Sequence, residues 1–219
     1  MTVSHQGSQK VINNQDDLHE GLKELASLEP RFGELFTQLG VPPLRRIEAG
    51  FQALVKAIVF QHISRASAES IWRKLVAQGL ITKEALLSAT DEDLIQTGLS
   101  YRKRHYVRRL VESDVDFAQL NNQLNKLNDQ DAISVLVSLE GIGRWTAEVY
   151  LLTAMGRADV FPAGDLALRK AVQEIWDLSE PPRETELRAL AEGWSPWRAV
   201  AARLLWAYYG AVIKGEGKR

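Results

Sequence analysis

Residues 139–148 read Leu-Glu-Gly-Ile-Gly-Arg-Trp-Thr-Ala-Glu, and this stretch decides the fold. Gly141 and Gly143 flank a single apolar residue between two segments with helical periodicity. Glycine adopts positive φ without steric cost, so the backbone can turn tightly here and start a new helix at once. The stretch therefore predicts two helices joined by a short hairpin.

The same hairpin brings bare backbone amides to the surface. The N–H groups of residues 143–146 open the second helix, and the partial positive charge of a helix N-terminus favours an anion. We therefore expect a phosphate site that ignores base identity, formed by Gly141, Gly143, Arg144 and Thr146. A Gly-x-Gly sequence on its own is more often a purely structural turn, so the binding hypothesis depends on the longer sequence around it.

Composition limits the classes of protein to which this chain can belong. Its 219 residues are 45% hydrophobic, enough for one large domain or two interlocked lobes with a real core. The absence of cysteine excludes disulfides, thiolate-bound zinc and cysteine-bound iron–sulfur clusters. The histidines show no spacing typical of a metal motif, so we expect no catalytic metal; they are His5, His19, His62 and His105.

The N-terminal residues and the hydropathy of the chain indicate its location in the cell. Residues 1–15 are polar and aperiodic, which predicts a flexible N-terminal tail rather than a signal peptide. No segment reaches the run of about 18 apolar residues that a membrane span requires. We therefore expect an intracellular monomer, cytoplasmic or associated with the nucleoid, without a membrane partner.

The distribution of charge along the chain says more about possible partners than the net charge does. The net charge of −1 does not by itself indicate a nucleic-acid binder. Residues 101–109, however, read YRKRHYVRR and contain five lysines and arginines. Such a run is typical either of a DNA-facing surface or of a solvated helix face.

Helical periodicity covers almost the whole chain and predicts about ten to twelve short helices without a convincing strand. Ser64 and Thr90 have the sequence context of helix N-caps, the latter within a capping box. Ser195-Pro196 predicts the start of the last long helix, with the serine as cap and the proline at the first helical position. Asp165 follows a Pro-Ala-Gly turn and precedes another helical pattern, which makes it an N-cap candidate as well.

GIGRWTA, followed by DVFPAGD at residues 159–165, resembles the helix-hairpin-helix DNA glycosylase superfamily, most closely its 3-methyladenine DNA glycosylase II branch. The resemblance covers about residues 45–212 and implies an all-α fold of two lobes around a central cleft. One lobe would span about residues 50–135, and the other residues 16–49 with 136–219. The chain is too short for the extra N-terminal α/β domain of larger bacterial members, so it resembles the compact form.

This resemblance implies a monofunctional enzyme of base excision repair. It would flip alkylated purines, such as 3-methyladenine and 7-methylguanine, out of duplex DNA and hydrolyse the glycosidic bond, leaving an abasic site. A helix-hairpin-helix module that only binds DNA is the alternative. A glycosylase–lyase for oxidised bases fits less well, because Trp145 stands where such enzymes have a lysine and because the four-cysteine cluster of related branches is absent.

The resemblance also assigns roles to individual residues. Asp165 would be the catalytic carboxylate, which stabilises the positive charge that develops on the sugar. An alkylated purine is already cationic, so it needs no general acid in order to leave. Trp145 and Trp206 would be aromatic walls of the pocket for the flipped base, although each could equally be a core tryptophan.

Further residues are expected on the DNA-binding surface. The corner Gln61-His62-Ile63-Ser64 resembles the QQIS or QLVS segment of the family, which places His62 at the position of the wedge that fills the vacated stack. Lys103, within a matching GLSYRK segment, is expected to line the DNA face. Glu140 departs from the family, where proline usually precedes GIG, and puts an acid beside the phosphate site.

No organic cofactor is implied. By precedent in the family, the backbone carbonyls of Val137, Leu139 and Gly141 could hold a monovalent cation that also contacts a DNA phosphate.

Overall fold

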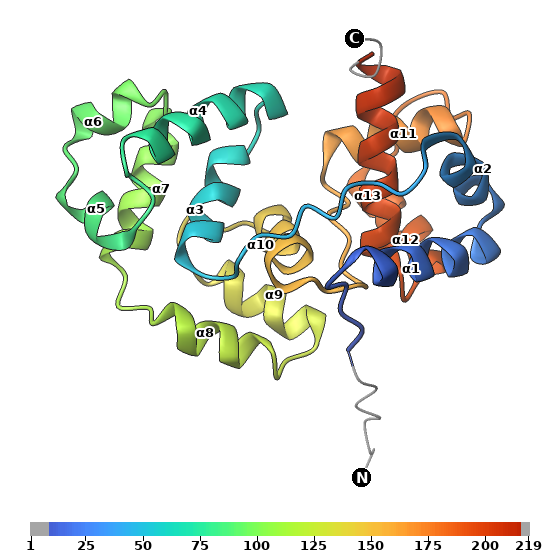
Figure 1. Ribbon diagram of the computed structural model, residues 1–219, viewed down its shortest axis with the longest axis horizontal. Coiled ribbons are helices and arrows are strands. Elements are labelled where there is room, and N and C mark those ends of the chain that lie inside the picture. Colours follow the sequence, from blue (N-terminus) through green and yellow to red (C-terminus); the bar gives the residue numbers. More distant parts are fainter. Residues whose placement is uncertain (1–8, 216–219) are drawn as a thin grey trace. The chain divides into compact units, whose positions relative to one another are not determined.

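The computed structural model describes residues 9–215, which divide into two units. The middle unit comprises Ile47–Tyr150, and the terminal unit contains the described chain up to Arg46 and from Leu151 onward. Both units are helical (Figure 1), and the expected all-α fold is confirmed. Between residues 9 and 215, the extended pairing is one isolated antiparallel bridge that joins Val11 to Arg157.

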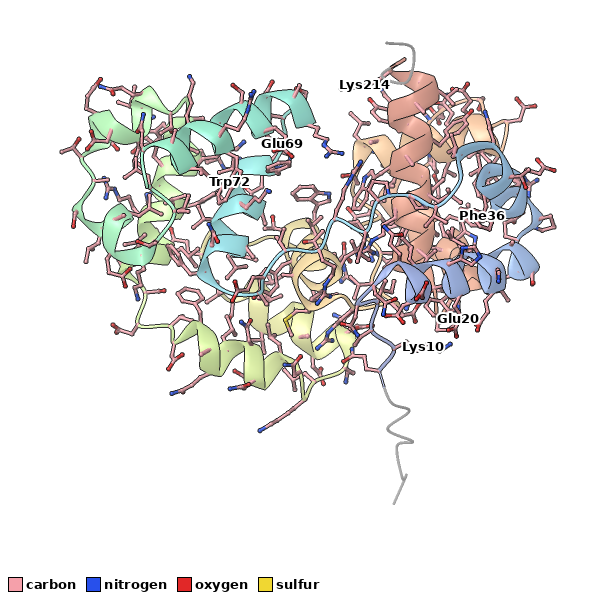
Figure 2. All side chains as sticks on the ribbon, viewed as in Figure 1. Lys10, Glu20, Phe36, Glu69, Trp72 and Lys214 are labelled. Carbon is pink, nitrogen blue, oxygen red and sulfur yellow. The ribbon has the colours of Figure 1, made fainter. Side chains whose placement is uncertain are left out.

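The middle unit is built around an apolar helix, α3. Leu54, Val55 and Ile58 of α3 are fully buried, and helices α4, α7 and α10 pack against it. On α4, Trp72 (Figure 2) lies beside Lys56 of α3, whose Nζ is 5.2 Å from the centre of the indole ring. The helices of this unit are α3 Phe51–Phe60, α4 Arg65–Ala77, α5 Lys83–Ser88, α6 Asp91–Gln96, α7 Tyr101–Glu112, α8 Phe117–Leu124, α9 Asp129–Val137 and α10 Arg144–Tyr150.

The predicted hairpin connects α9 to α10 and belongs to the middle unit. The boundary expected near residue 135 therefore lies at Tyr150 instead. Three hydrogen bonds explain the shift. Gln61 donates to Gly141 O in the hairpin and to Thr146 Oγ1 in α10, and Tyr150 OH donates to Asn121 Oδ1 at 2.6 Å. Side chains far apart in sequence thus bind residues 136–150 to the middle unit.

The terminal unit is assembled from both ends of the chain around α13. Helices α1, α2 and α11 pack on α13, and a Cβ at Gly21 of α1 would come within 2.6 Å of the Trp197 ring, so these two segments approach closely. None of the helices within residues 9–215 is both long and apolar enough to cross a bilayer. The elements are α1 Gln15–Leu28, α2 Pro30–Leu39, the π-helical turn η1 Leu151–Met155, α11 Leu166–Ile175, α12 Glu184–Ala191, the 3-10 turn η2 Glu192–Trp194, α13 Arg198–Tyr208 and the π-helical turn η3 Tyr209–Ile213.

The prediction of a flexible tail over residues 1–15 is wrong for Ile12 and for Asn14, which caps α1. Residues 1–8 of that prediction lie outside the described part of the chain. Ile12, in contrast, is fully buried in the core of the terminal unit, and its N–H donates to Gly156 O at 2.7 Å. A single Val-Ile pair in a polar stretch gives no periodic signal, which is why the sequence prediction was wrong here.

A buried arginine links the segment where the chain leaves the terminal unit to the segment where the chain re-enters it. Arg203 of α13 is 4% exposed and donates to Leu44 O at 3.1 Å, Leu152 O at 2.9 Å and Ala199 O at 3.2 Å. Burial, and to a lesser degree the neighbouring arginines Arg46 and Arg45, lowers its pKa to about 10. Leu44 precedes the middle unit and Leu152 follows it, so one side chain fixes both connections.

The local start signals were mostly predicted correctly. Ser64 caps α4, and Thr90 forms a capping box with Asp93 at the start of α6. The start of the last helix was predicted too early: α13 begins at Arg198, two residues beyond Pro196. Ser195 does not cap it, because its hydroxyl donates to Asp159 Oδ2 at 2.8 Å.

Candidate functional site

The hairpin between α9 and α10 has the tight geometry that its glycines predict. Gly141 has φ of 85°, and a Cβ there would lie 2.6 Å from Tyr106 Cγ of α7. Gly143 differs, since a Cβ at this position would meet no atom within 4 Å. Gly141 is therefore required by the fold, whereas Gly143 leaves open space in front of the first amides of α10.

The side chains of the two other predicted phosphate ligands are engaged within the protein. Thr146 is 2% exposed, and its Oγ1 accepts a hydrogen bond from Gln61. The Arg144 guanidinium donates to the buried Glu148 carboxylate at 3.0 Å and to Gln130 Oε1 at 3.3 Å. Contact of Thr146 with a phosphate would therefore use its backbone N–H, and contact of Arg144 through its side chain would require one of these bonds to open.

Glu140, which replaces the usual proline, is paired with α7. Its carboxylate accepts from Arg109 Nε at 2.8 Å and lies 2.9 Å from His105 Nε2. The hydrogen bond from Arg109, followed by that from His105, lowers the pKa of Glu140 below its usual value. The negative charge of Glu140 is thus paired with basic side chains of α7.

Lys103 does not line a DNA-binding face, so this expectation was wrong. The side chain is 7% exposed, and its Nζ donates to Val59 O, in the last turn of α3, at 2.7 Å. Burial lowers the pKa of its amine. A basic residue on a helix can turn inward where a carbonyl at the end of another helix lacks a partner.

The other basic side chains of α7 also form hydrogen bonds within the protein. They are therefore neither a plain solvated helix face nor a row of cations without protein partners. Arg102 donates to Tyr106 OH, Arg104 to Asp91 and Leu99 O, Arg108 to Leu86 O and Ala89 O, and Arg109 to Glu140. Helix α7 is thus a scaffold that holds α3, the end of α5 and the hairpin through its basic side chains.

The corner at residues 61–64 presents His62 outward. Gln61 is buried, and its Nε2 donates to Gly141 O and to Thr146 Oγ1, both at 2.9 Å. His62 is exposed and has φ of 54°, an uncommon conformation for a residue other than glycine. Sequence reasoning identified His62 but missed the link from Gln61 to the hairpin, because no local pattern connects positions 80 residues apart.

Asp165 is the N-cap of α11, as predicted. Its Oδ1 accepts from the backbone N–H of Ala167 at 2.9 Å and of Leu168 at 3.2 Å. The side chain is partly exposed, and Leu166 next to it is 55% exposed. The amides thus hold the carboxylate in a fixed orientation at the surface of the terminal unit.

The two candidate pocket tryptophans are both half-buried. Trp206 of α13 packs against the core of the terminal unit, and Trp145 is in the first turn of α10 in the middle unit. Neither is a fully buried core residue, so part of each indole surface can reach a ligand. Asp165 and Trp206 thus belong to the terminal unit, and the hairpin, Trp145 and His62 to the middle unit.

The carbonyl groups proposed to hold a cation lie where α9 ends. Leu139 O already accepts from Ile142 N at 3.1 Å, and Gly141 O from Gln61. A carbonyl oxygen has two lone pairs, so these hydrogen bonds leave one lone pair on each oxygen for a cation. The described residues contain no cluster of His, Cys, Asp or Glu side chains suited to a metal ion.

Comparison with known proteins identifies the family. The model of the HhH-GPD superfamily base excision DNA repair proteins matches residues 55–196. The "Alkylbase DNA glycosidase-like protein mag2" of Schizosaccharomyces pombe is 26% identical over 218 residues, which cover 94% of this chain and 100% of the relative.

Two solved structures have the same fold over most of their length. The 3-methyladenine DNA glycosylase Mag1 of Schizosaccharomyces pombe, in complex with abasic DNA, gives a TM-score of 0.76 at 25% identity, covering 85% of this chain and 95% of Mag1. A DNA-3-methyladenine glycosidase of Bacillus halodurans gives a TM-score of 0.69 at 28% identity, covering 89% and 91%. Because the family model spans more than half of the sequence, the chain belongs to the HhH-GPD superfamily of base excision DNA repair proteins.

Proposed function

We propose that this protein is a monofunctional DNA glycosylase that excises alkylated purines, such as 3-methyladenine and 7-methylguanine, from duplex DNA. The observation that carries the proposal is Asp165, a carboxylate oriented by two backbone amides in a member of a base excision repair family. The names of the relatives support the substrate class, since two are called 3-methyladenine DNA glycosylases or glycosidases and one an alkylbase DNA glycosidase-like protein.

Asp165 would act on the sugar rather than on the leaving base. Breaking the glycosidic bond builds positive charge on the deoxyribose, and a fixed carboxylate stabilises it. A base alkylated at a ring nitrogen carries a positive charge and leaves as a neutral purine. Water then adds to the sugar and releases one proton, which the carboxylate can accept. The hydrolysis is balanced without a second acid.

Trp145 supports hydrolysis without strand cleavage. A lyase step requires an amine that attacks the sugar and forms an imine, and an indole nitrogen cannot do so. Lys103, the lysine of the basic run, is bonded to Val59 O inside the middle unit. We therefore expect no covalent adduct when the protein and damaged duplex DNA are treated with borohydride, as analysed on a denaturing gel. A trapped adduct of the unmodified protein would contradict the monofunctional assignment.

The remaining site residues divide between recognition and support. The open surface at Gly143 would receive a DNA phosphate, and the half-buried indoles of Trp145 and Trp206 would stack on the flipped, electron-poor base. His62 would fill the vacated position in the duplex. A monovalent cation at the carbonyls of Val137, Leu139 and Gly141 would supply positive charge to the same phosphate, and no other cofactor is required.

Base release separates this function from its alternative, a module that only binds DNA. Duplexes with one 3-methyladenine analogue or one 7-methylguanine are incubated with excess protein, and abasic sites are measured by alkaline cleavage. The glycosylase should convert the lesion strand and leave a matched undamaged strand intact. A protein that shifts both duplexes in a gel but releases no base would be the binding module, because the hairpin alone suffices for binding.

A further inference from the structure

The corner at residues 61–64 holds a conformation that its own sequence does not favour. His62 has φ of 54° and is exposed, so no packing of its imidazole in a core compensates for the backbone strain. Residues other than glycine occupy this region at a cost, and they stay there only when the surroundings impose it. The groups that impose it must therefore be the contacts made by the residues next to His62.

Lys103 is the first of these groups. Its Nζ donates to Val59 O at 2.7 Å, three residues before His62, and the side chain is 7% exposed. The last carbonyls of a helix lack intrahelical partners, and a cation there also meets the negative end of the helix dipole. A buried lysine is costly unless it is bonded, so its location at the end of α3 indicates a role in fixing where this helix stops.

Gln61 is the second group and ties the residue before His62 to another segment of the middle unit. Its two Nε2 hydrogens have two acceptors, Gly141 O in the hairpin and Thr146 Oγ1 in α10. The residue immediately before His62 is thereby tied to the segment expected to hold the DNA phosphate. The end of α3 and the hairpin become one rigid support.

We infer that Lys103 and Gln61 are positioning residues that fix the corner so that His62 is presented in advance to the DNA duplex. The inference rests on the proposed function, in which His62 enters the base stack. Neither side chain touches the DNA. Lys103 acts through the last turn of α3, and Gln61 acts through the hairpin.

The test compares Lys103→Met with a matched control, Arg108→Met. Arg108 also lies on α7 and donates to carbonyls at the end of another helix, α5, through Leu86 O and Ala89 O. Both substitutions remove a basic side chain that caps a helix C-terminus, but only one of these helices leads to His62. Gln61→Met removes the second support and serves if Lys103→Met does not fold.

Two measurements are made with each purified variant at a temperature where all are folded by circular dichroism. The first is the single-turnover excision rate for one lesion in a paired and in a mismatched duplex, because a mismatched base needs less energy to flip. The second is the fluorescence of 2-aminopurine placed next to a stable abasic-site analogue, which reports unstacking without requiring catalysis.

Lys103→Met and Gln61→Met should each slow excision from the paired duplex by about tenfold or more and from the mismatched duplex much less, because misplacing a group by about 1 Å is enough for such losses. They should also reduce the fluorescence increase, whereas Arg108→Met should change neither the rate ratio nor the fluorescence. Equal rate ratios for the Lys103 and Arg108 variants, with unchanged fluorescence, would show that Lys103 is merely structural. If the unmodified protein releases no base, the proposed function fails, and the fluorescence comparison still decides the inference about the corner.

Discussion

Two tight turns in this molecule each lead directly into a helix. Residues 139–143 precede α10 in the middle unit, and residues 162–165 precede α11 in the terminal unit. Gly143 offers the amides of α10 no side chain and leaves open space before them, whereas Asp165 bonds two amides of α11 with its own carboxylate. The same electrostatic feature, a helix N-terminus, is left open in one case and orients the protein's own anion in the other.

The largest effect is expected when Asp165 loses its charge but still caps α11. Asp165→Asn preserves an N-cap oxygen, because asparagine caps helices about as well as aspartate, but it eliminates the anion that we propose to stabilise the sugar cation. We expect base release to fall by at least about 100-fold while the melting temperature stays nearly unchanged. The measurement is single-turnover excision alongside thermal unfolding. Activity within about tenfold of the unmodified protein, roughly 1.4 kcal/mol, would leave Asp165 with a structural role only.

Substitutions at the two hairpin glycines should affect different properties: one the stability of the turn, the other its binding of a ligand. Gly141→Ala forces an alanine to φ of 85° and against Tyr106, which should lower the free energy of unfolding by about 1–3 kcal/mol. Gly143→Ala meets no atom within 4 Å and should cost only about 0.5 kcal/mol. Urea unfolding of both variants checks this order.

The added methyl group of Gly143→Ala should still obstruct a phosphate. Its affinity for damaged and undamaged duplex DNA should therefore decrease by the same factor, since a phosphate contact does not read the base. Fluorescence anisotropy with both duplexes measures the two affinities. A loss confined to the lesion duplex would show that Gly143 shapes the base pocket instead.

A substitution of His62 tests whether binding of the DNA backbone and capture of a flipped base depend on different residues. His62→Ala should slow excision from a fully paired duplex several-fold and affect a mismatched one less, because it removes the side chain that we propose to fill the vacated position in the base stack. Affinity for undamaged duplex should hardly change, since phosphate contacts carry it. The same single-turnover comparison applies, and an unchanged rate in the paired duplex would leave His62 as a corner residue only.

The smallest effect concerns Glu140, the acid beside the open helix terminus. Arg109 and His105 lower its pKa in the folded state, so the pairing stabilises the fold above the ordinary pKa of 4.5. This contribution is lost as the pH falls through the lowered value. The stability difference between the unmodified protein and Glu140→Gln should therefore be present at neutral pH and vanish in acid, as measured by urea unfolding at several pH values. A difference that persists at the lowest pH would show that charge pairing is not its source.

Local sequence signals predicted what local interactions determine. The hairpin, the caps at Ser64 and Thr90 and the cap at Asp165 each depend on residues within three or four positions, and the structure confirms them. The direction of Lys103 could not be predicted in the same way, because its partner Val59 lies 44 residues away and becomes adjacent only when α3 packs on α7.

The same reason explains the boundary between the units and the start of α13. The hairpin segment looks independent in the sequence, yet Gln61 ties it to α3. Ser195 has the chemistry of a helix cap, but Asp159 takes its hydroxyl. Where a side chain has several possible hydrogen-bond partners, tertiary contacts decide which one it binds. A single sequence does not show these contacts.

The discontinuity of the terminal unit has a consequence for protein synthesis. The middle unit is one uninterrupted segment, so it can complete its fold while later residues are still being added by the ribosome. The first helices cannot, because Ile12 needs the carbonyl of Gly156 and Leu44 needs the guanidinium of Arg203. Helices α1 and α2 must therefore wait through the synthesis of the whole middle unit. During translation, the apolar faces of α1 and α2 that later pack on α13 stay uncovered over this whole interval.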